Sequence, residues 1–143
     1  MEILLKLNLK MELTDSMLMP PLYVILKNKR YTLAVKYVRK GETLKNTIDF
    51  LIKEIEAIGF KIKTLFLDRE FYTIEVINYL QNRKTSFIMP CVKKGPSGGI
   101  RNLLTGRKSY STEYTMRSKE SEATFQVNVL VKYSKGKYKR NGI

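Results

Sequence analysis

Two short runs of mainly hydrophobic residues lie between residues 22 and 38. The runs LYVIL and RYTLAVKYV are rich in β-branched and aromatic side chains, and the polar sequence KNK at positions 27–29 separates them. Such a pattern predicts a β-hairpin. In the second run, hydrophobic side chains occupy every second position: Tyr31, Leu33, Val35 and Tyr37. We therefore expect one face of the second strand to be buried.

A helical period follows between residues 41 and 59. Hydrophobic side chains recur three or four positions apart, and charged side chains occupy the other faces of the same segment. Gly59 is a suitable C-terminal cap. The pattern predicts a helix whose buried stripe contains Leu44, Ile48, Leu51, Ile52, Ile55 and Ile58.

Two further strands and one helix are predicted between residues 62 and 89. Residues 62–67 form a short apolar run without strict alternation, which is typical of an interior strand covered on both faces. Thr73 is a suitable N-cap for a helix whose buried stripe is Val76, Ile77 and Leu80. Residues 86–89 then predict another buried strand.

The elements follow one another as strand, strand, helix, strand, helix, strand, which predicts an α/β fold with a mixed sheet. Residues 1–19 show no clear period, and the two prolines that follow end any helix, so the pattern assigns no element there. The glycine-rich segment 95–99 marks a boundary, after which ATFQVNVLVKY predicts one alternating strand. We therefore divide the chain into an N-terminal segment, 1–20, a core, 21–95, and a basic β-rich appendage, 96–143.

The chain is strongly basic. Lys and Arg number 27 against 13 Asp and Glu, for a net charge of +14, and residues 93–143 alone hold 12 of the basic and 3 of the acidic residues. This balance favours a polyanionic partner, above all nucleic acid, although a solvated lysine-rich surface has the same composition.

Residue types that are rare in the chain limit its chemistry and location. A single cysteine and the lack of histidine exclude a disulfide within the chain, Cys/His zinc sites and histidine acid–base catalysis. Any catalysis would therefore depend on carboxylates. Charged residues interrupt the first apolar run at Glu2, Lys6, Lys10 and Glu12, so we expect a cytoplasmic protein without a signal peptide or a membrane span.

Asp68 is the leading candidate for a catalytic residue. It follows a predicted buried strand, and open α/β sheets bind ligands beyond the carboxyl ends of their strands. An aspartate between a strand and a helix is also an ordinary turn or capping residue, which is the alternative. Arg69 could bind a phosphate through its planar donors, or it could pair with a nearby acid such as Glu75.

The last third of the chain interleaves tyrosines with cations, which suits phosphate contacts and base stacking on nucleic acid. The alternative is a solvated basic strand pair whose aromatic residues serve packing. The tyrosines are Tyr110, Tyr114, Tyr133 and Tyr138. The candidate nucleic-acid contacts, together with Arg69, are Arg107, Lys108, Lys132, Lys135, Lys137, Lys139 and Arg140.

Residues 21–95 resemble a known group of enzymes. The hairpin sequence, the long helix and KTLFLDREFYTIEVINYLQNRKTSFIMPCVKKG are similar to the DDE transposases of prokaryotic insertion sequences, above all at LFLDREF and FIMP. The resemblance implies a ribonuclease-H-like fold in which two Asp and one Glu hold two Mg²⁺ or Mn²⁺ ions for DNA cleavage and strand transfer. Asp68 matches the second of these carboxylates and is the expected catalytic and metal-binding residue.

Two departures from the family limit the expected activity. The family's first Asp lies on a strand before the hairpin, where Asp15 is a poor substitute, and its Glu lies on a later helix that we do not find. We therefore expect an incomplete, truncated copy of the ribonuclease-H-like fold that binds DNA and has little or no activity alone. The alternatives are a non-catalytic nucleic-acid-binding module and a homo-oligomer that assembles the missing carboxylates.

Overall fold

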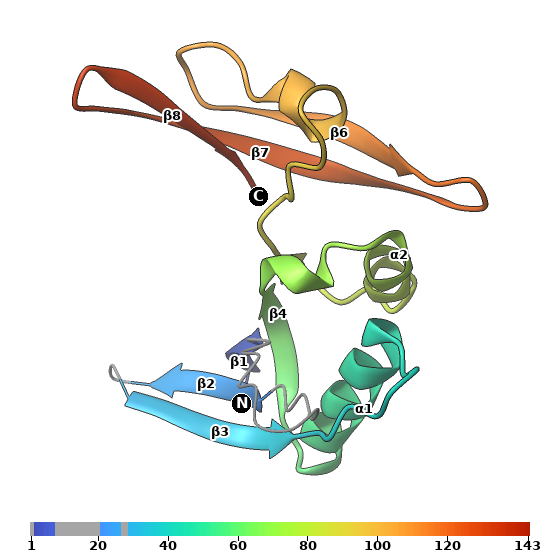
Figure 1. The fold of residues 1–143 in the computed structure, drawn as a ribbon. Coiled ribbons are helices and arrows are strands. Elements are labelled where there is room, and N and C mark those ends of the chain that lie inside the picture. Colours follow the sequence, from blue (N-terminus) through green and yellow to red (C-terminus); the bar gives the residue numbers. More distant parts are fainter. Residues whose placement is uncertain (1, 8–20, 27–28) are drawn as a thin grey trace.

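The computed structural model describes residues 2–7, 21–26 and 29–143, and it contains two β-sheets and two α-helices (Figure 1). The first sheet has five strands in the order β3-β2-β1-β4-β5. These strands are β1, Glu2–Leu7; β2, Pro21–Leu26; β3, Lys29–Val35; β4, Lys61–Leu67; and β5, Phe87–Ile88. The mixed α/β class predicted from the sequence is confirmed, and the described helices include none that is long and apolar enough to span a membrane.

Strand directions divide the first sheet into two parts. β1 pairs antiparallel with β2, and β2 pairs antiparallel with β3, as predicted for the hairpin. On its other side β1 pairs parallel with β4, and β4 pairs parallel with β5. The parallel strands are connected through helices, as expected because a parallel pair requires a crossover. β4 therefore lies in the interior of the sheet, as predicted from its apolar run without strict alternation.

β1 is an element that the sequence pattern left unassigned in residues 1–20. Glu2–Leu7 forms the middle strand of the sheet, bonded to β2 and to β4. An interior strand with neighbours on both edges does not need the hydrophobic alternation of a half-exposed strand, so its pattern is weak. β1 therefore connects the hairpin strands to the parallel strands in one sheet. Asp15 lies outside the described residues.

Threonine caps begin both helices. The Oγ1 atom of Thr43 accepts a hydrogen bond from the N–H of Asn46 at the start of α1, Leu44–Ala57. Thr73 does the same for the N–H of Val76 at the start of α2, Ile74–Asn82, as predicted. Gly59, with φ +86°, follows α1 in the left-handed conformation that glycine adopts without strain. Each of the two threonine caps satisfies a backbone N–H that the first helical turn leaves free.

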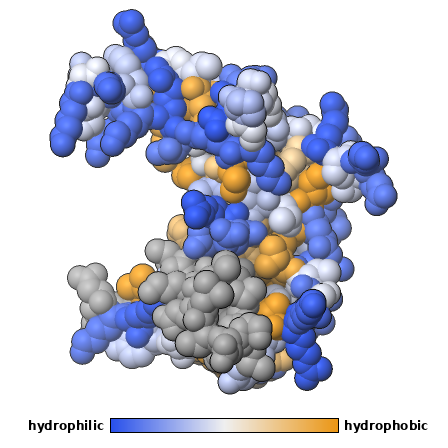
Figure 2. All heavy atoms as spheres, viewed as in Figure 1, coloured by the Kyte–Doolittle hydropathy of each residue, from blue (hydrophilic) through white to orange (hydrophobic). Residues whose placement is uncertain are grey.

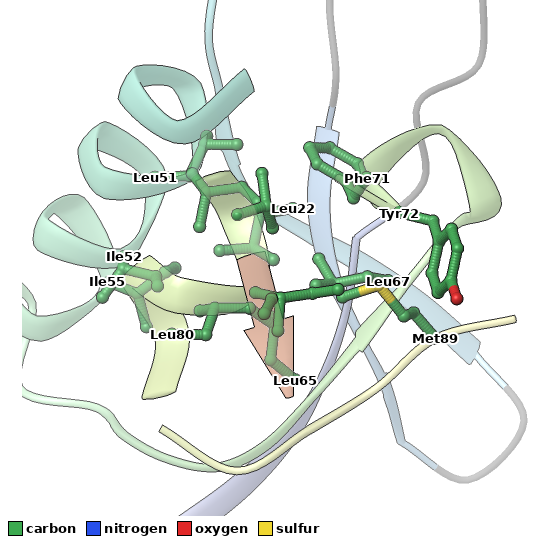
Figure 3. Packing of buried hydrophobic residues seen from close by; sticks show 14 of the residues in the cluster. Leu22, Leu51, Ile52, Ile55, Leu65, Leu67, Phe71, Tyr72, Leu80 and Met89 are labelled. Carbon is green, nitrogen blue, oxygen red and sulfur yellow. The ribbon is translucent and has the colours of Figure 1, made fainter. Parts of the chain in front are cut away.

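The core fills the space between the helices and the first sheet (Figure 3). All the residues predicted for the buried stripe of α2 are buried, whereas Ile58, predicted for the stripe of α1, is exposed just beyond that helix. Phe71 is also fully buried, and it belongs to the short 3₁₀ turn Arg69–Phe71 that follows β4. Its burial anchors the turn that carries Asp68.

Two predictions about strands need correction. Tyr31, Val35 and Tyr37 are 49%, 43% and 59% exposed, so the expected buried face of β3 is not formed. β3 is an edge strand, and only Leu33 and Ala34 of it pack against the core. The strand predicted at residues 86–89 is shorter in the structure, where β5 contains only Phe87 and Ile88.

The second sheet consists of β6, Tyr110–Arg117; β7, Glu122–Ser134; and β8, Lys137–Gly142, all antiparallel. The first sheet and the two α-helices form the first layer of the molecule, and the second sheet forms the second layer. The two layers meet at α2. The side chains of Asn78 and Gln81 donate hydrogen bonds to backbone carbonyls of β7 at 2.9 and 2.8 Å, and Phe125 packs edge-to-face on Tyr72 with ring centroids 5.9 Å apart. The predicted long strand is β7.

Candidate functional site

Asp68 lies where the sequence predicted it, directly after the last residue of β4. One carboxylate oxygen accepts a hydrogen bond from the N–H of Arg69 at 2.6 Å, so the side chain caps the 3₁₀ turn. The other oxygen has no protein partner among the described residues. Asp68 therefore combines the capping role with one free acceptor at the carboxyl end of a parallel strand.

β1 ends beside Asp68. Leu7, the last residue of β1, is level with Leu67, the last residue of β4, and the two strands run in the same direction. Their carboxyl ends therefore lie at the same edge of the sheet, where α/β folds bind ligands. The next residue in the sequence after Leu7 is Asn8, an amide rather than a carboxylate, and its position lies outside the described residues.

The described carboxylates do not fit a tightly held Mg²⁺ or Mn²⁺ ion around Asp68. Glu70 points its carboxylate at Arg69, with a nitrogen–oxygen distance of 3.5 Å, and Glu75 lies in the first turn of α2, where a negative charge favours the helix. No group of three or more acidic or cysteine side chains in the described residues could hold a metal. Mg²⁺ needs several anionic oxygens before it gives up its water shell.

Arg69 is separated from the other cations that the sequence selected. It follows β4 in the first layer, is exposed and pairs with Glu70 rather than with Glu75. The other seven selected cations lie in or next to the second sheet, within residues 107–140. The structure therefore assigns Arg69 to the surroundings of Asp68 and not to the basic surface.

The basic residues of β7 and β8 divide between the two faces of the second sheet. Lys132 is paired with Lys139, and Ser134 with Lys137, so the three lysines share the face opposite Val127 and Val129. The pair formed by Tyr133 and Tyr138 belongs to the other face. Hydrophilic residues cover this arm of the molecule at the upper left of Figure 2.

Tyr138 is the centre of a cluster of aromatic and basic side chains. Its ring lies 4.9 Å from that of Tyr133, and the guanidinium carbons of Arg107 and Arg140 lie 5.9 and 5.5 Å from its centroid. The Nε–H of Arg140 also donates to the carbonyl of Gly106 at 2.7 Å, which fixes β8 to the loop that carries Arg107. The structure thus brings two of the predicted contacts together.

The other two tyrosines have packing roles. Tyr114 meets Phe125 edge-to-face with ring centroids 5.7 Å apart, and the hydroxyl of Tyr110 donates to the carbonyl of Leu103. Tyr114 is half-buried, whereas Tyr110 is 38% exposed, about as much as Tyr138 at 37%. Tyr133 and Tyr138 differ from Tyr110 in that their two rings lie against each other at the surface of the second sheet.

Two cations near β8 were missed by sequence reasoning. Lys93 donates to the carbonyl of Arg140 at 3.2 Å, and Arg101 donates to the carbonyl of Gly95 at 2.8 Å. Both line a groove of about 420 Å³ along β8, together with Tyr138, Lys139 and Arg140. They precede β8 by some forty positions in the sequence, and no local pattern links segments so far apart.

Charge is segregated along the second sheet. Residues 93–112 and 123–143 together contain ten Lys and Arg and no Asp or Glu, whereas Glu113, Glu120 and Glu122 lie at or near the hairpin between β6 and β7. Glu113 is paired with Gln126, six residues from Lys132 along β7, or about 20 Å at the usual rise per residue. Among the described residues, none of these ten cations forms a salt bridge.

Cys91 lies between the two layers and is not part of either feature. Burial raises the pKa of its thiol, and the Tyr72 hydroxyl lies against it. A buried thiol with a raised pKa is a poor nucleophile. No protein family, curated protein or solved structure matches this chain.

Proposed function

We propose that the chain is a transposase-derived protein of the DDE class that binds DNA and does not cleave it by itself. The proposal includes a ribonuclease-H-like core for the first layer. It also assigns DNA binding to the basic end of the second sheet.

The order of elements supports the family assignment. The chain runs β1, β2, β3, α1, β4, α2, β5, and this order adds a first strand to the strand, strand, helix, strand, helix, strand order of the resemblance. In the family, the first catalytic Asp lies on a strand before the hairpin and the second lies at the position of Asp68. β1 also precedes the hairpin and runs parallel to β4 with matching ends, but its sequence, EILLKL, contains no Asp.

The single observation that carries DNA binding is the segregation of charge on the second sheet. Ten cations without one carboxylate in residues 93–112 and 123–143 give a surface of one sign. Lysine and arginine that are not neutralised by protein acids release counterions from nucleic acid when they bind its phosphates, which is the main source of non-specific affinity. Evenly mixed charges, as on an ordinary solvated surface, would not give this effect.

The lack of cleavage follows from the carboxylates around Asp68. One free oxygen of Asp68 is a single anionic ligand, and Glu70 is engaged by Arg69. Two-metal phosphoryl transfer requires both ions to be held against the attacking and leaving oxygens. The described residues offer too few ligands for this, so we assign no catalytic step to the chain alone.

A nicking assay tests this part of the proposal. Supercoiled plasmid is incubated with Mg²⁺ or Mn²⁺ and either the wild-type chain or the Asp68→Ala variant, and nicked circles are quantified. We expect equal, background nicking in both samples. Nicking by the wild type that Asp68→Ala abolishes would show that copies of the chain assemble an active site, and would overturn the assignment.

A non-catalytic nucleic-acid-binding module without transposase ancestry is the second candidate, because Asp68 also caps a turn. The two candidate functions predict different results for weak binding of metal ions at Asp68. A transposase-derived core should bring Mn²⁺ at millimolar concentration to the free oxygen of Asp68, which would broaden the amide signals of residues 68–70 in NMR spectra of the wild type. Loss of this broadening in Asp68→Asn supports the family proposal, and its absence in the wild type favours the module.

A further inference from the structure

The groove along β8 differs chemically from the rest of the basic surface. Four of its lining residues are cations, Lys93, Arg101, Lys139 and Arg140, and no lining residue is acidic. It has a volume of about 420 Å³ and is open to solvent along one side of the edge strand. A concave site lined by cations concentrates the positive potential and selects anions.

Each of the two arginines of the groove is fixed by one hydrogen bond and keeps further N–H donors for a ligand. Arg140 uses its Nε–H on the carbonyl of Gly106, and Arg101 uses its Nε–H on the carbonyl of Gly95. A guanidinium has five N–H donors, so four remain on each side chain without a protein partner among the described residues. Pre-positioned forks of this kind match the oxygens of a phosphate group.

An exposed aromatic pair lies at the rim of the same groove. Tyr138 lines the groove, and Tyr133 packs against Tyr138 with ring centroids 4.9 Å apart. Tyr133 is 62% exposed and Tyr138 is 37% exposed. A ring held at the surface by a second ring offers a flat platform at little cost in side-chain entropy.

We infer that this groove binds a single strand of nucleic acid, with backbone phosphates on the groove cations and an unpaired base stacked on Tyr133. The inference rests on the proposed nucleic-acid binding and specifies the form of the ligand. The phosphate contacts alone would suit a duplex equally well. The aromatic pair Tyr133 and Tyr138 favours a single strand, because the bases of a duplex are already stacked and paired and present no free face.

Fluorescence anisotropy with a labelled oligothymidylate of about 12 nucleotides, within the usual size of single-strand sites, tests the phosphate contacts. The variant Lys93→Gln/Lys139→Gln removes two groove cations, and Arg117→Gln/Lys119→Gln removes two at the far end of the β6–β7 hairpin as a matched control. We expect the first pair to lower the slope of log K against log salt by about 1.4, since each single-strand phosphate contributes about 0.7. Equal slopes for the two variants would overturn the inference.

Tyr133→Ala and Tyr133→Phe test the stacking. Base stacking on an aromatic side chain corresponds to an affinity change of about fivefold to a hundredfold, so Ala should weaken oligothymidylate binding by this factor and Phe should not. An abasic oligonucleotide of equal length should bind both variants alike, because it has no base to stack. Equal losses with the abasic strand would contradict stacking.

Competition distinguishes this inference from the proposed function. Unlabelled oligothymidylate and oligouridylate should displace the probe from the groove better than a duplex of the same charge, since neither contact depends on the 2′-hydroxyl. Equal displacement by the duplex would overturn the strand preference and leave DNA binding intact. Failure of the wild type to bind either strand form would remove both.

Discussion

At the scale of single residues, the buried Tyr72 and the half-buried Tyr79 differ in how their hydroxyl groups are satisfied. The hydroxyl of Tyr79 donates to the Oδ1 atom of Asp49 at 2.8 Å and links α2 to α1. The buried hydroxyl of Tyr72 has only the Cys91 thiol beside it, and burial raises its pKa well above the ordinary value. Thiols are weak hydrogen-bond partners, so the Tyr72 hydroxyl contributes little to stability.

Substitution to phenylalanine should separate the two tyrosines. Tyr79→Phe removes a hydrogen bond to a charged acceptor and should lower the free energy of unfolding by about 1 kcal/mol. Tyr72→Phe removes a poorly satisfied buried hydroxyl and should leave the free energy of unfolding unchanged or slightly raised. Urea denaturation of both variants checks this, and a larger loss for Tyr72→Phe than for Tyr79→Phe would contradict it.

Asp49 should make stability depend on acidity. Hydrogen bonds from Lys53 and from Tyr79 hold the pKa of its carboxyl below the ordinary value. Burial, and next the hydrogen bond to Asp49, raise the pKa of Tyr79 to about 12. A lowered carboxyl pKa stabilises the fold above the unfolded value of about 3.9, and the effect is lost as pH falls through the folded pKa.

The variant Asp49→Asn measures this contribution. It should unfold more easily than the wild type at neutral pH, by less than about 1 kcal/mol because the pair is partly exposed. The difference should shrink as the pH is lowered below about 4, where the wild-type carboxyl also becomes neutral. A difference that is constant between neutral pH and pH of about 3 would show that the carboxylate charge is not the cause.

At the scale of elements, the sequence predicted what has a local signal. The caps Thr73 and Gly59, the apolar run of β4 and the alternation of β7 all appear where their patterns indicated. β1 has no such signal, because an interior strand is specified by its partners on both sides rather than by its own period. The exposure of β3 likewise depends on its place at the edge, which no local pattern encodes.

The central place of β1 gives a prediction about the backbone. Leu5 is level with Val24 of β2 and with Leu65 of β4, so its main chain lies between two strands. Leu5→Pro removes a backbone donor from the interior of a sheet and should cost about 3 kcal/mol or more. Leu5→Val keeps the donor and serves as the control. Thermal melts that are alike for both variants would show that residue 5 is not in an interior strand.

The candidate site was predictable in part. Asp68 could be selected because strand, turn and family motif coincide within a few residues, and Tyr138, Arg107 and Arg140 because cations and aromatic residues cluster locally. Lys93 and Arg101 reach the groove only through the path of the chain between the two sheets. Contacts between distant segments depend on tertiary packing, and a single sequence does not specify them.

At the scale of the whole molecule, the two layers have different tasks in this account. The first layer provides the sheet that positions Asp68, and the second carries ten cations and no carboxylate in residues 93–112 and 123–143. Asn78, Gln81 and the contact of Tyr72 with Phe125 hold the layers together. The second sheet is therefore attached to the core near the hairpin between β6 and β7. Its basic end lies away from this attachment and remains open to a ligand.

The affinity for duplex DNA as a function of salt concentration tests the central claim most directly. We predict that log K falls linearly with log salt, and that replacing five cations outside the groove with glutamine lowers the slope by about 4.5, since each duplex phosphate contributes about 0.9. These cations are Arg107, Lys108, Lys132, Lys135 and Lys137. Absence of binding at low salt, or a slope that the five substitutions leave unchanged, would contradict the account.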